Sequence, residues 1–135
     1  MPHLAHVTLL VPDYDEAIAF YVGRLGFTLV EDMVLSSAKR WVTVRPPGGP
    51  EAATLLLLAC AATPEQRAAI GRQAGGRVAF FLSTDDFARD HAAFTAVGVR
   101  FLEPPRHEPY GTVAVFQDPF GNRWDLIEPA TRSAT

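Results

Sequence analysis

An internal repeat constrains the fold of this chain more than any other feature of its sequence. The segment HVTLLVPDYDEAIAFYVGRLGFTLVED (6–32) aligns with RVAFFLSTDDFARDHAAFTAVGVRFLEP (77–104). Bringing Gly26 onto Gly98 requires only one extra residue after the first strand of the second copy. A duplicated unit whose strands cannot bury their faces alone predicts two modules that share one curved sheet, with helices outside and a pocket on the concave side.

Each copy is predicted to have the element order β-α-β-β-β. Short β-prone apolar runs predict the strands, and apolar residues at helical spacing followed by glycine predict the helices. Thr63 and Pro64 are typical first residues of a helix, which predicts a short helical linker over 63–76. The predicted strands are 6–11, 27–32, 40–46, 53–60, 77–82, 99–104, 111–119 and 122–129, and the predicted helices are 15–26 and 85–98.

This order predicts an α+β fold in which two βαβββ modules form a curved, mostly antiparallel sheet. Residues 1–135 are expected to form a single domain, with module one at about 4–61, the linker at 62–76 and module two at about 77–129. A chain of this length can bury one sizeable core.

Composition excludes several classes of function. Hydrophobic residues make up 48% and charged residues 20%, which is typical of a globular domain. The net charge of −3 comes without a basic cluster, so nucleic acid is not an expected partner. The single cysteine, Cys60, excludes an intrachain disulfide and a cysteine-based metal cage. No apolar stretch approaches the roughly 18 residues that span a membrane, and no signal peptide is recognisable, so we expect a cytoplasmic protein without membrane partners.

The duplication and two of its segments resemble the vicinal oxygen chelate superfamily. These segments are HVTLLVPDYDEAIAFYVGRLGF (6–27) and VFQDPFGNRWDLIEP (115–129), and the resemblance extends over roughly residues 4–129. The superfamily includes glyoxalase I, extradiol dioxygenases, fosfomycin-resistance thiol transferases and bleomycin-resistance proteins. The resemblance implies the glyoxalase/bleomycin-resistance fold and a homodimer in which both chains complete each cavity. It does not identify a reaction, because one fold supports many.

The resemblance also implies where a metal would be held in this fold. Metal-dependent members use a His on the first strand, a ligand on the first strand of the second module, and a carboxylate seven residues after the Asp of the turn. In this chain the three positions hold His6, Arg77 (or Val78, if the register slips by one) and Asp125. Arginine offers only donors and keeps its charge, and valine cannot ligate. The ligand set is therefore incomplete, and no cofactor is expected, although a divalent metal held by His6, Asp125 and further ligands remains the alternative.

Without a metal, the same positions suggest a different arrangement. Arg77 and Asp125 could form a bidentate ion pair inside the cavity, with His6 beside it. Three interpretations stay open: Arg77 binds a polar or anionic ligand, His6 and Asp125 form a proton-transfer pair with His6 as the catalytic base, or the ion pair is only structural.

Aromatic residues supply the other candidate ligand contacts. Strand alternation puts Phe81 on the face of Arg77, while Trp41, Tyr110 and Phe116 could also line the cavity. We therefore expect a metal-independent protein that binds a small polar or anionic molecule. The alternative is a lyase, isomerase or transferase that uses a metal at His6 and Asp125, or metal-free acid–base chemistry by His6, so whether the chain is an enzyme stays open.

Overall fold

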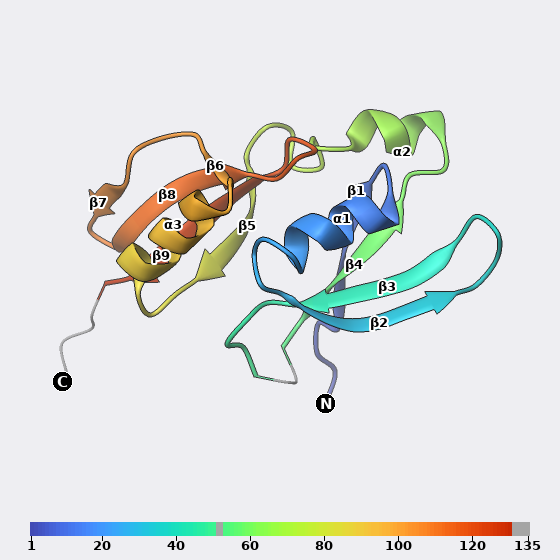
Figure 1. Cartoon of the computed structure of the whole chain (residues 1–135), viewed down its shortest axis with the longest axis horizontal. Helices are drawn as coiled ribbons and strands as arrows, with labels where there is room; N and C mark the ends of the chain where they lie inside the picture. Colours follow the sequence, from blue (N-terminus) through green and yellow to red (C-terminus); the bar gives the residue numbers. More distant parts are fainter. Residues whose placement is uncertain (51–52, 131–135) are drawn as a thin grey trace. The chain divides into compact units, whose positions relative to one another are not determined.

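The computed structural model describes residues 1–50 and 53–130, and its chain forms two compact units, Met1–Gln73 and Ala74–Thr135 (Figure 1). Each unit contains one sheet and one helix that covers a face of that sheet. Among the described residues, no helix is long and apolar enough to cross a membrane.

Unit 1 is a four-stranded mixed sheet with the order β1-β4-β3-β2, in which only β1 and β4 run parallel. The helix α1 covers one face, because Leu9, Val11, Leu56 and Leu58 alternate onto that side and are buried with Phe20. Its elements are β1 (His6–Val11), α1 (Tyr14–Tyr21), β2 (Thr28–Val34), β3 (Arg40–Arg45), β4 (Leu55–Cys60) and the short α2 (Pro64–Ala69).

Unit 2 repeats this plan in a sheet of order β5-β9-β8-β6, with β7 paired to β8 and only β5 and β9 parallel. An aromatic core fills the space under its helix, where Phe116 stacks on Trp124 and contacts Phe94 and Phe101. Its elements are β5 (Val78–Ser83), α3 (Phe87–Ala96), β6 (Arg100–Phe101), β7 (Arg106–Glu108), β8 (Gly111–Gln117) and β9 (Arg123–Pro129).

The repeated β-α-β-β-β order and the α+β fold class are confirmed, with differences of detail. The hydrogen bonds divide the strands between two sheets, whereas one shared sheet was predicted. The linker helix, predicted over 63–76, ends at Ala69. Gly71 follows shortly after, and its positive φ of 74° is not helical. The strand expected over 99–104 is only two residues long, because Pro104 and Pro105 cannot donate to a sheet. The strand β7 was not predicted.

Candidate functional site

Each sheet has one face covered by its helix, and we call the opposite face the open face. On unit 1, His6 and Thr8 alternate onto the open face, while Leu9 lies under α1. His6 is exposed at the start of β1 and contacts the edge of Trp41, with 5.5 Å between ring centroids. Two of the predicted ligand contacts, His6 and Trp41, are therefore neighbours.

A carboxylate that sequence analysis did not single out organises this open face. Glu31, on β2, accepts hydrogen bonds from Trp41 Nε1 at 3.1 Å and from Thr43 Oγ1 at 3.3 Å. Thr43 is fully buried, and the register pairs it with Glu31. Alternation within the predicted strand 27–32 could have placed Glu31 on this face, but the pairing of β2 with β3 was needed to bring it to Trp41.

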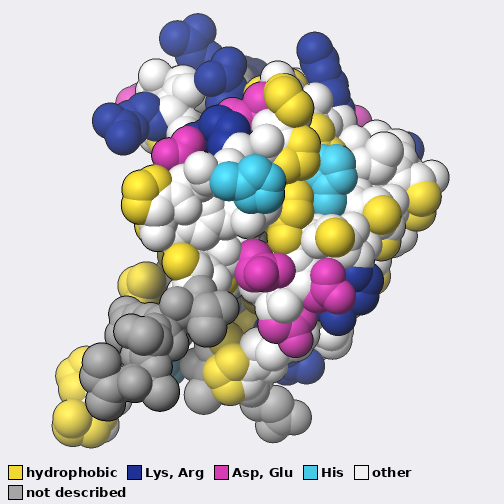
Figure 2. Space-filling view, turned by 90° about the vertical axis from the view of Figure 1, so that its left-hand side faces the viewer, with side chains coloured by type: hydrophobic (Ala, Val, Ile, Leu, Met, Phe, Trp, Pro, Cys, Tyr) yellow, Lys and Arg dark blue, Asp and Glu magenta, His cyan; other side chains and the backbone are white. Residues whose placement is uncertain are grey.

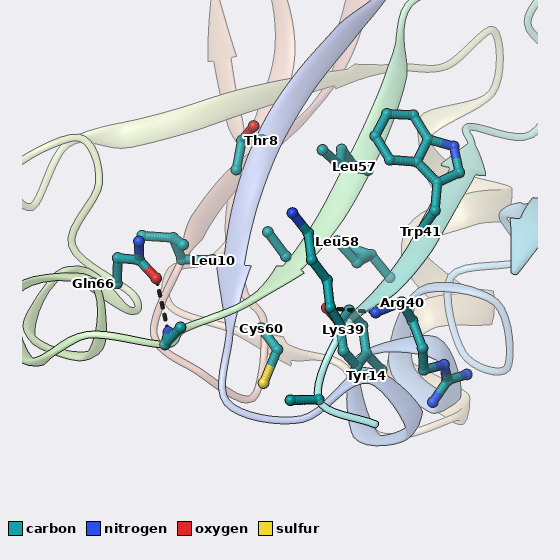
Figure 3. Close-up of a pocket in the computed structure, with 13 residues that line it drawn as sticks. Thr8, Leu10, Tyr14, Lys39, Arg40, Trp41, Leu57, Leu58, Cys60 and Gln66 are labelled. Carbon is teal, nitrogen blue, oxygen red and sulfur yellow. Dashed lines mark hydrogen bonds between the residues drawn. The ribbon is translucent and has the colours of Figure 1, made fainter. Parts of the chain in front are cut away.

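A cavity of about 440 Å³ lies against unit 1 at the end of β1 and β4 (Figure 3). Most of its wall is apolar, and Trp41 and Leu57 form one side in the close-up. The polar groups are few, and Gln66 is held in place because its Oε1 accepts from the backbone N–H of Ala62 at 2.7 Å. The lining residues are Thr8, Leu10, Tyr14, Ala38, Lys39, Arg40, Trp41, Leu57, Leu58, Ala59, Cys60, Ala62 and Gln66.

Two cations border this cavity, and they differ in what they can still bind. Arg40 donates to Asp15 at 2.9 Å and to Asp32 at 2.7 Å, and its guanidinium lies 5.1 Å from the centre of the Tyr14 ring. Its charge is thus already balanced. Lys39 makes no side-chain hydrogen bond or ion pair with any described residue, and in Figure 3 its side chain extends back toward the strands. Sequence analysis missed Lys39 because it lies in a segment to which no element was assigned.

Unit 2 contains the turn DPFGN (118–122), which is built around one buried carboxylate. Asp118 accepts from the backbone N–H groups of Phe120 and Asn122 at 3.0 and 2.8 Å, and from Asn122 Nδ2 at 2.7 Å. Both Asp118 and Asn122 are 2% exposed. The turn therefore fixes where β9 begins, and with it the position of Asp125 seven residues later.

Asp125 is buried on the open face of unit 2, and its neighbours differ from those predicted. The strand register places Phe81 on β5 and Val115 on β8 beside it. Arg77 lies before β5 and is exposed, and no ion pair joins it to Asp125 within the described chain. A register shift between Val78 and Phe80 is the cause, because it aligns Val78 with the open-face residue Arg123. The predicted Arg77–Asp125 pair is therefore wrong.

One oxygen of the Asp125 carboxylate has no partner among the residues that the structure describes. Its Oδ1 is buried and receives no hydrogen bond from the described residues, and burial raises the pKa of Asp125. Arg106 acts on Asp125 only through its charge, because its Nε bonds Glu103 and its Nη1 bonds Glu108 at 3.0 Å. Glu103 opposes that effect by raising the pKa further.

The aromatic candidates of unit 2 separate into exposed and buried residues. Phe81 is 66% exposed beside Asp125, and Tyr110 is 54% exposed in the turn before β8. Phe116 is fully buried, because it pairs with Trp124 on the side of α3, away from the face of Asp125. The remaining predictions about ligand contacts are not tested by these positions alone.

The histidines of unit 2 serve packing or lie at an edge. His91, on α3, stacks against Phe87 at 5.4 Å and lies 4.2 Å from the ring of Phe101. His107, on β7, has its Nδ1 3.3 Å from Thr112 Oγ1. The face drawn in Figure 2 likewise shows histidine side chains beside hydrophobic ones. Neither residue belongs to a cluster that could replace a missing metal ligand.

The residues at the family's metal positions do not fit a divalent cation. A catalytic metal generally takes three or more protein ligands. In this chain the second-module position is occupied by exposed Arg77 or, by register, Val78. Among residues 1–50 and 53–130, no group of three or more His, Cys, Asp or Glu side chains could hold a metal ion.

Comparisons with known proteins agree with this architecture. A protein of unassigned function from Shewanella frigidimarina (strain NCIMB 400) is 52% identical over 126 residues, which cover 93% of this chain and 92% of that protein. The crystal structure of UcmS2 has a TM-score of 0.80 at 32% identity, covering 95% of this chain and 98% of the other. TnmS3, described as an antibiotic binding protein from Streptomyces sp. CB03234, has a TM-score of 0.76 at 30% identity, covering 96% and 98%. Residues 3–126 match the sequence model of the Glyoxalase/Bleomycin resistance protein/Dioxygenase superfamily, and the chain belongs to this family.

Proposed function

We propose that this chain is a metal-independent small-molecule-binding protein of its superfamily, which holds a polar or anionic ligand against the sheet of a unit. The cavity on unit 1 is the observation that carries the proposal. Its volume of about 440 Å³ lies within the usual range for ligand sites, and apolar side chains with few polar groups form its wall. That TnmS3 is described as an antibiotic binding protein supports the same kind of role.

Within this cavity, Lys39 is the group that would recognise an acidic substituent of the ligand. It has no partner among the described side chains, whereas the neighbouring Arg40 is balanced by two carboxylates. Trp41 and Leu57 would contact the apolar part of the ligand. His6 would contribute through Trp41, whose indole it touches.

A homodimer is part of the proposal. The edge strand β2 exposes apolar side chains, including Met33 at 52% and Val34 at 74%. Exposed apolar strand edges are unusual in monomers because they favour association. Sedimentation equilibrium of the full chain should give twice the monomer mass, and a monomer at micromolar concentration would contradict this part.

The ligand-binding proposal is tested by a thermal-shift screen of small acidic and neutral aromatic compounds against the full chain. Lys39→Met should weaken binding of acidic hits, while Arg24→Met, which removes an exposed cation elsewhere in unit 1, should leave it unchanged. If no compound in a broad library raises the melting temperature, the proposed function is wrong.

The alternative is an enzyme that uses a metal at His6 and Asp125, or His6 as a base without metal. Elemental analysis of protein purified without chelators or a His tag, followed by titration with Mn, Fe, Ni and Zn, separates the cases. About one metal per chain that is lost in His6→Ala would favour the metal enzyme. Turnover of any hit that disappears in His6→Asn, without bound metal, would favour acid–base chemistry.

A further inference from the structure

The open face of unit 2 presents an unpaired carboxylate beside an exposed aromatic ring. Asp125 is 7% exposed, and its Oδ1 is buried without a hydrogen-bond partner among the described residues. Phe81, its register neighbour on β5, is 66% exposed. A buried acceptor without a donor is costly, and so is a phenyl ring held in water. A single ligand that contacts both Asp125 and Phe81 would relieve both costs.

Arg106 is the cation whose charge acts on Asp125, but it cannot supply the missing hydrogen bond. Arg106 directs its Nε at Glu103 and its Nη1 at Glu108, and it also hydrogen-bonds Tyr110. Moving it to Asp125 would break these bonds and leave two carboxylates unpaired. Arg77, which was expected to be the partner, is exposed before β5. No described side chain donates to Asp125, so the donor is a group that a bound ligand could supply.

We propose that Asp125 and Phe81 form a subsite for a ligand group that donates a hydrogen bond, a hydroxyl or an ammonium, carried on a flat ring. The ring lies against Phe81, and its donor reaches the carboxylate of Asp125. This inference rests on the proposed function and narrows it, since an anionic group is repelled here even if Lys39 accepts one on unit 1. Burial raises the pKa of Asp125, which is consistent with a carboxylate that lacks a donor.

Matched naphthalene probes test the subsite in the full chain. The probes are 2-naphthalenemethanol, its methyl ether, 2-naphthalenemethylamine and 2-naphthoate, and binding is followed by NMR titration of the backbone amides of β5 and β9. A hydrogen bond to a charged group predicts that the alcohol or the amine binds at least about tenfold more tightly than the ether. The ether keeps the ring and loses only the donor, so it is the internal control.

Two variants test whether Asp125 causes the preference for a donor group and whether Phe81 binds the ring. Asp125→Leu should make the alcohol and the ether bind equally, because it removes the acceptor and keeps an apolar side chain. Phe81→Ala should weaken the binding of the alcohol, the amine and the ether together. Because Phe81 is exposed, this variant should keep the fold, which its NMR spectrum checks directly. Whichever of the alcohol and the amine binds more tightly identifies the kind of donor.

Equal affinities for alcohol and ether, tightest binding of 2-naphthoate, or no saturable binding of any probe at β5 and β9 would each overturn the subsite. None of these outcomes by itself contradicts the proposed small-molecule binding. A screening hit that depends on Lys39 and is insensitive to Asp125→Leu would support small-molecule binding while refuting this inference.

Discussion

Replacing Asp125 by asparagine should stabilise the protein at neutral pH. The variant keeps the size and shape of the side chain but removes a charge from a site where Oδ1 has no donor. The amide still presents an acceptor without a donor, but it is uncharged and therefore costs less to bury than the carboxylate. Burying a polar group without a partner costs about 1–3 kcal/mol and more for a charged one, so we expect the free energy of unfolding to rise by about 1–3 kcal/mol. With an unfolding entropy of about 2.1 cal/mol/K per residue, a chain of 135 residues should melt about 4–10 °C higher.

The pH dependence of this effect has a defined sign. Burial raises the pKa of Asp125, so the folded protein holds this proton more tightly than the unfolded chain does. The contribution of Asp125 to stability is complete below the unfolded pKa, near 4, and is lost as the pH rises through the raised folded pKa. The advantage of Asp125→Asn should therefore be largest near neutrality and should fade toward about pH 4. Thermal and urea unfolding of both proteins across this range measures it.

Asp118 supplies a matched control, because it is a second buried aspartate in the same unit. Its carboxylate accepts three hydrogen bonds in the turn, one of them at 2.7 Å from Asn122 Nδ2. Asp118→Asn should therefore destabilise the protein, in contrast to Asp125→Asn. A loss of stability in Asp125→Asn at pH 7 would refute the reasoning, since it would mean that a donor such as a guanidinium already pairs this carboxylate.

Three further changes test other parts of the structure. Gly111→Ala should lower the free energy of unfolding by about 1–3 kcal/mol in urea melts, because its φ is +152° and a Cβ would collide with the carbonyl oxygen of Glu128. Asp13→Ala should cost about 1 kcal/mol in the same assay, because its Oδ2 accepts from Glu16 N–H at 2.8 Å at the start of α1, whereas Asp13→Asn should restore most of it. Lys39→Met should reduce the affinity for acidic ligands several-fold in calorimetric titrations without lowering the melting temperature.

Much of the fold could be predicted because the repeat and the alternation of apolar residues act locally. Strand alternation within 122–129 is enough to put Trp124 and Leu126 on the side opposite Asp125, and the structure buries both. The extent of several elements could not be predicted in the same way. The prolines between residues 102 and 110 break the strand that apolar composition suggested, and the three-residue β7 carries no apolar pattern of its own.

The candidate site was harder to predict, because it depends on pairing between strands. A single register shift between Val78 and Phe80 removed Arg77 from the face of Asp125, and alternation within β5 alone cannot reveal such a shift. The face on which Phe116 lies could not be predicted from β8 alone for a related reason, since it depends on which residue of β9 it meets. Glu31 and Lys39 were overlooked because their roles come from neighbouring strands and a cavity.

The same register shift explains how two copies of one motif came to offer different chemistry. In unit 1, β1 pairs with β4 without interruption, so His6 stays on its strand and on the open face. In unit 2, the aligned residue Arg77 precedes β5, and Asp125 has no ion-pair partner among the described residues where the sequence suggested a balanced pair. Unit 1 thus offers the ammonium of Lys39, which has no partner in the described part of the chain, and unit 2 offers an acceptor at Asp125. We therefore expect the binding of acidic ligands to depend on Lys39 in unit 1, and the binding of donor-bearing ligands to depend on Asp125 in unit 2.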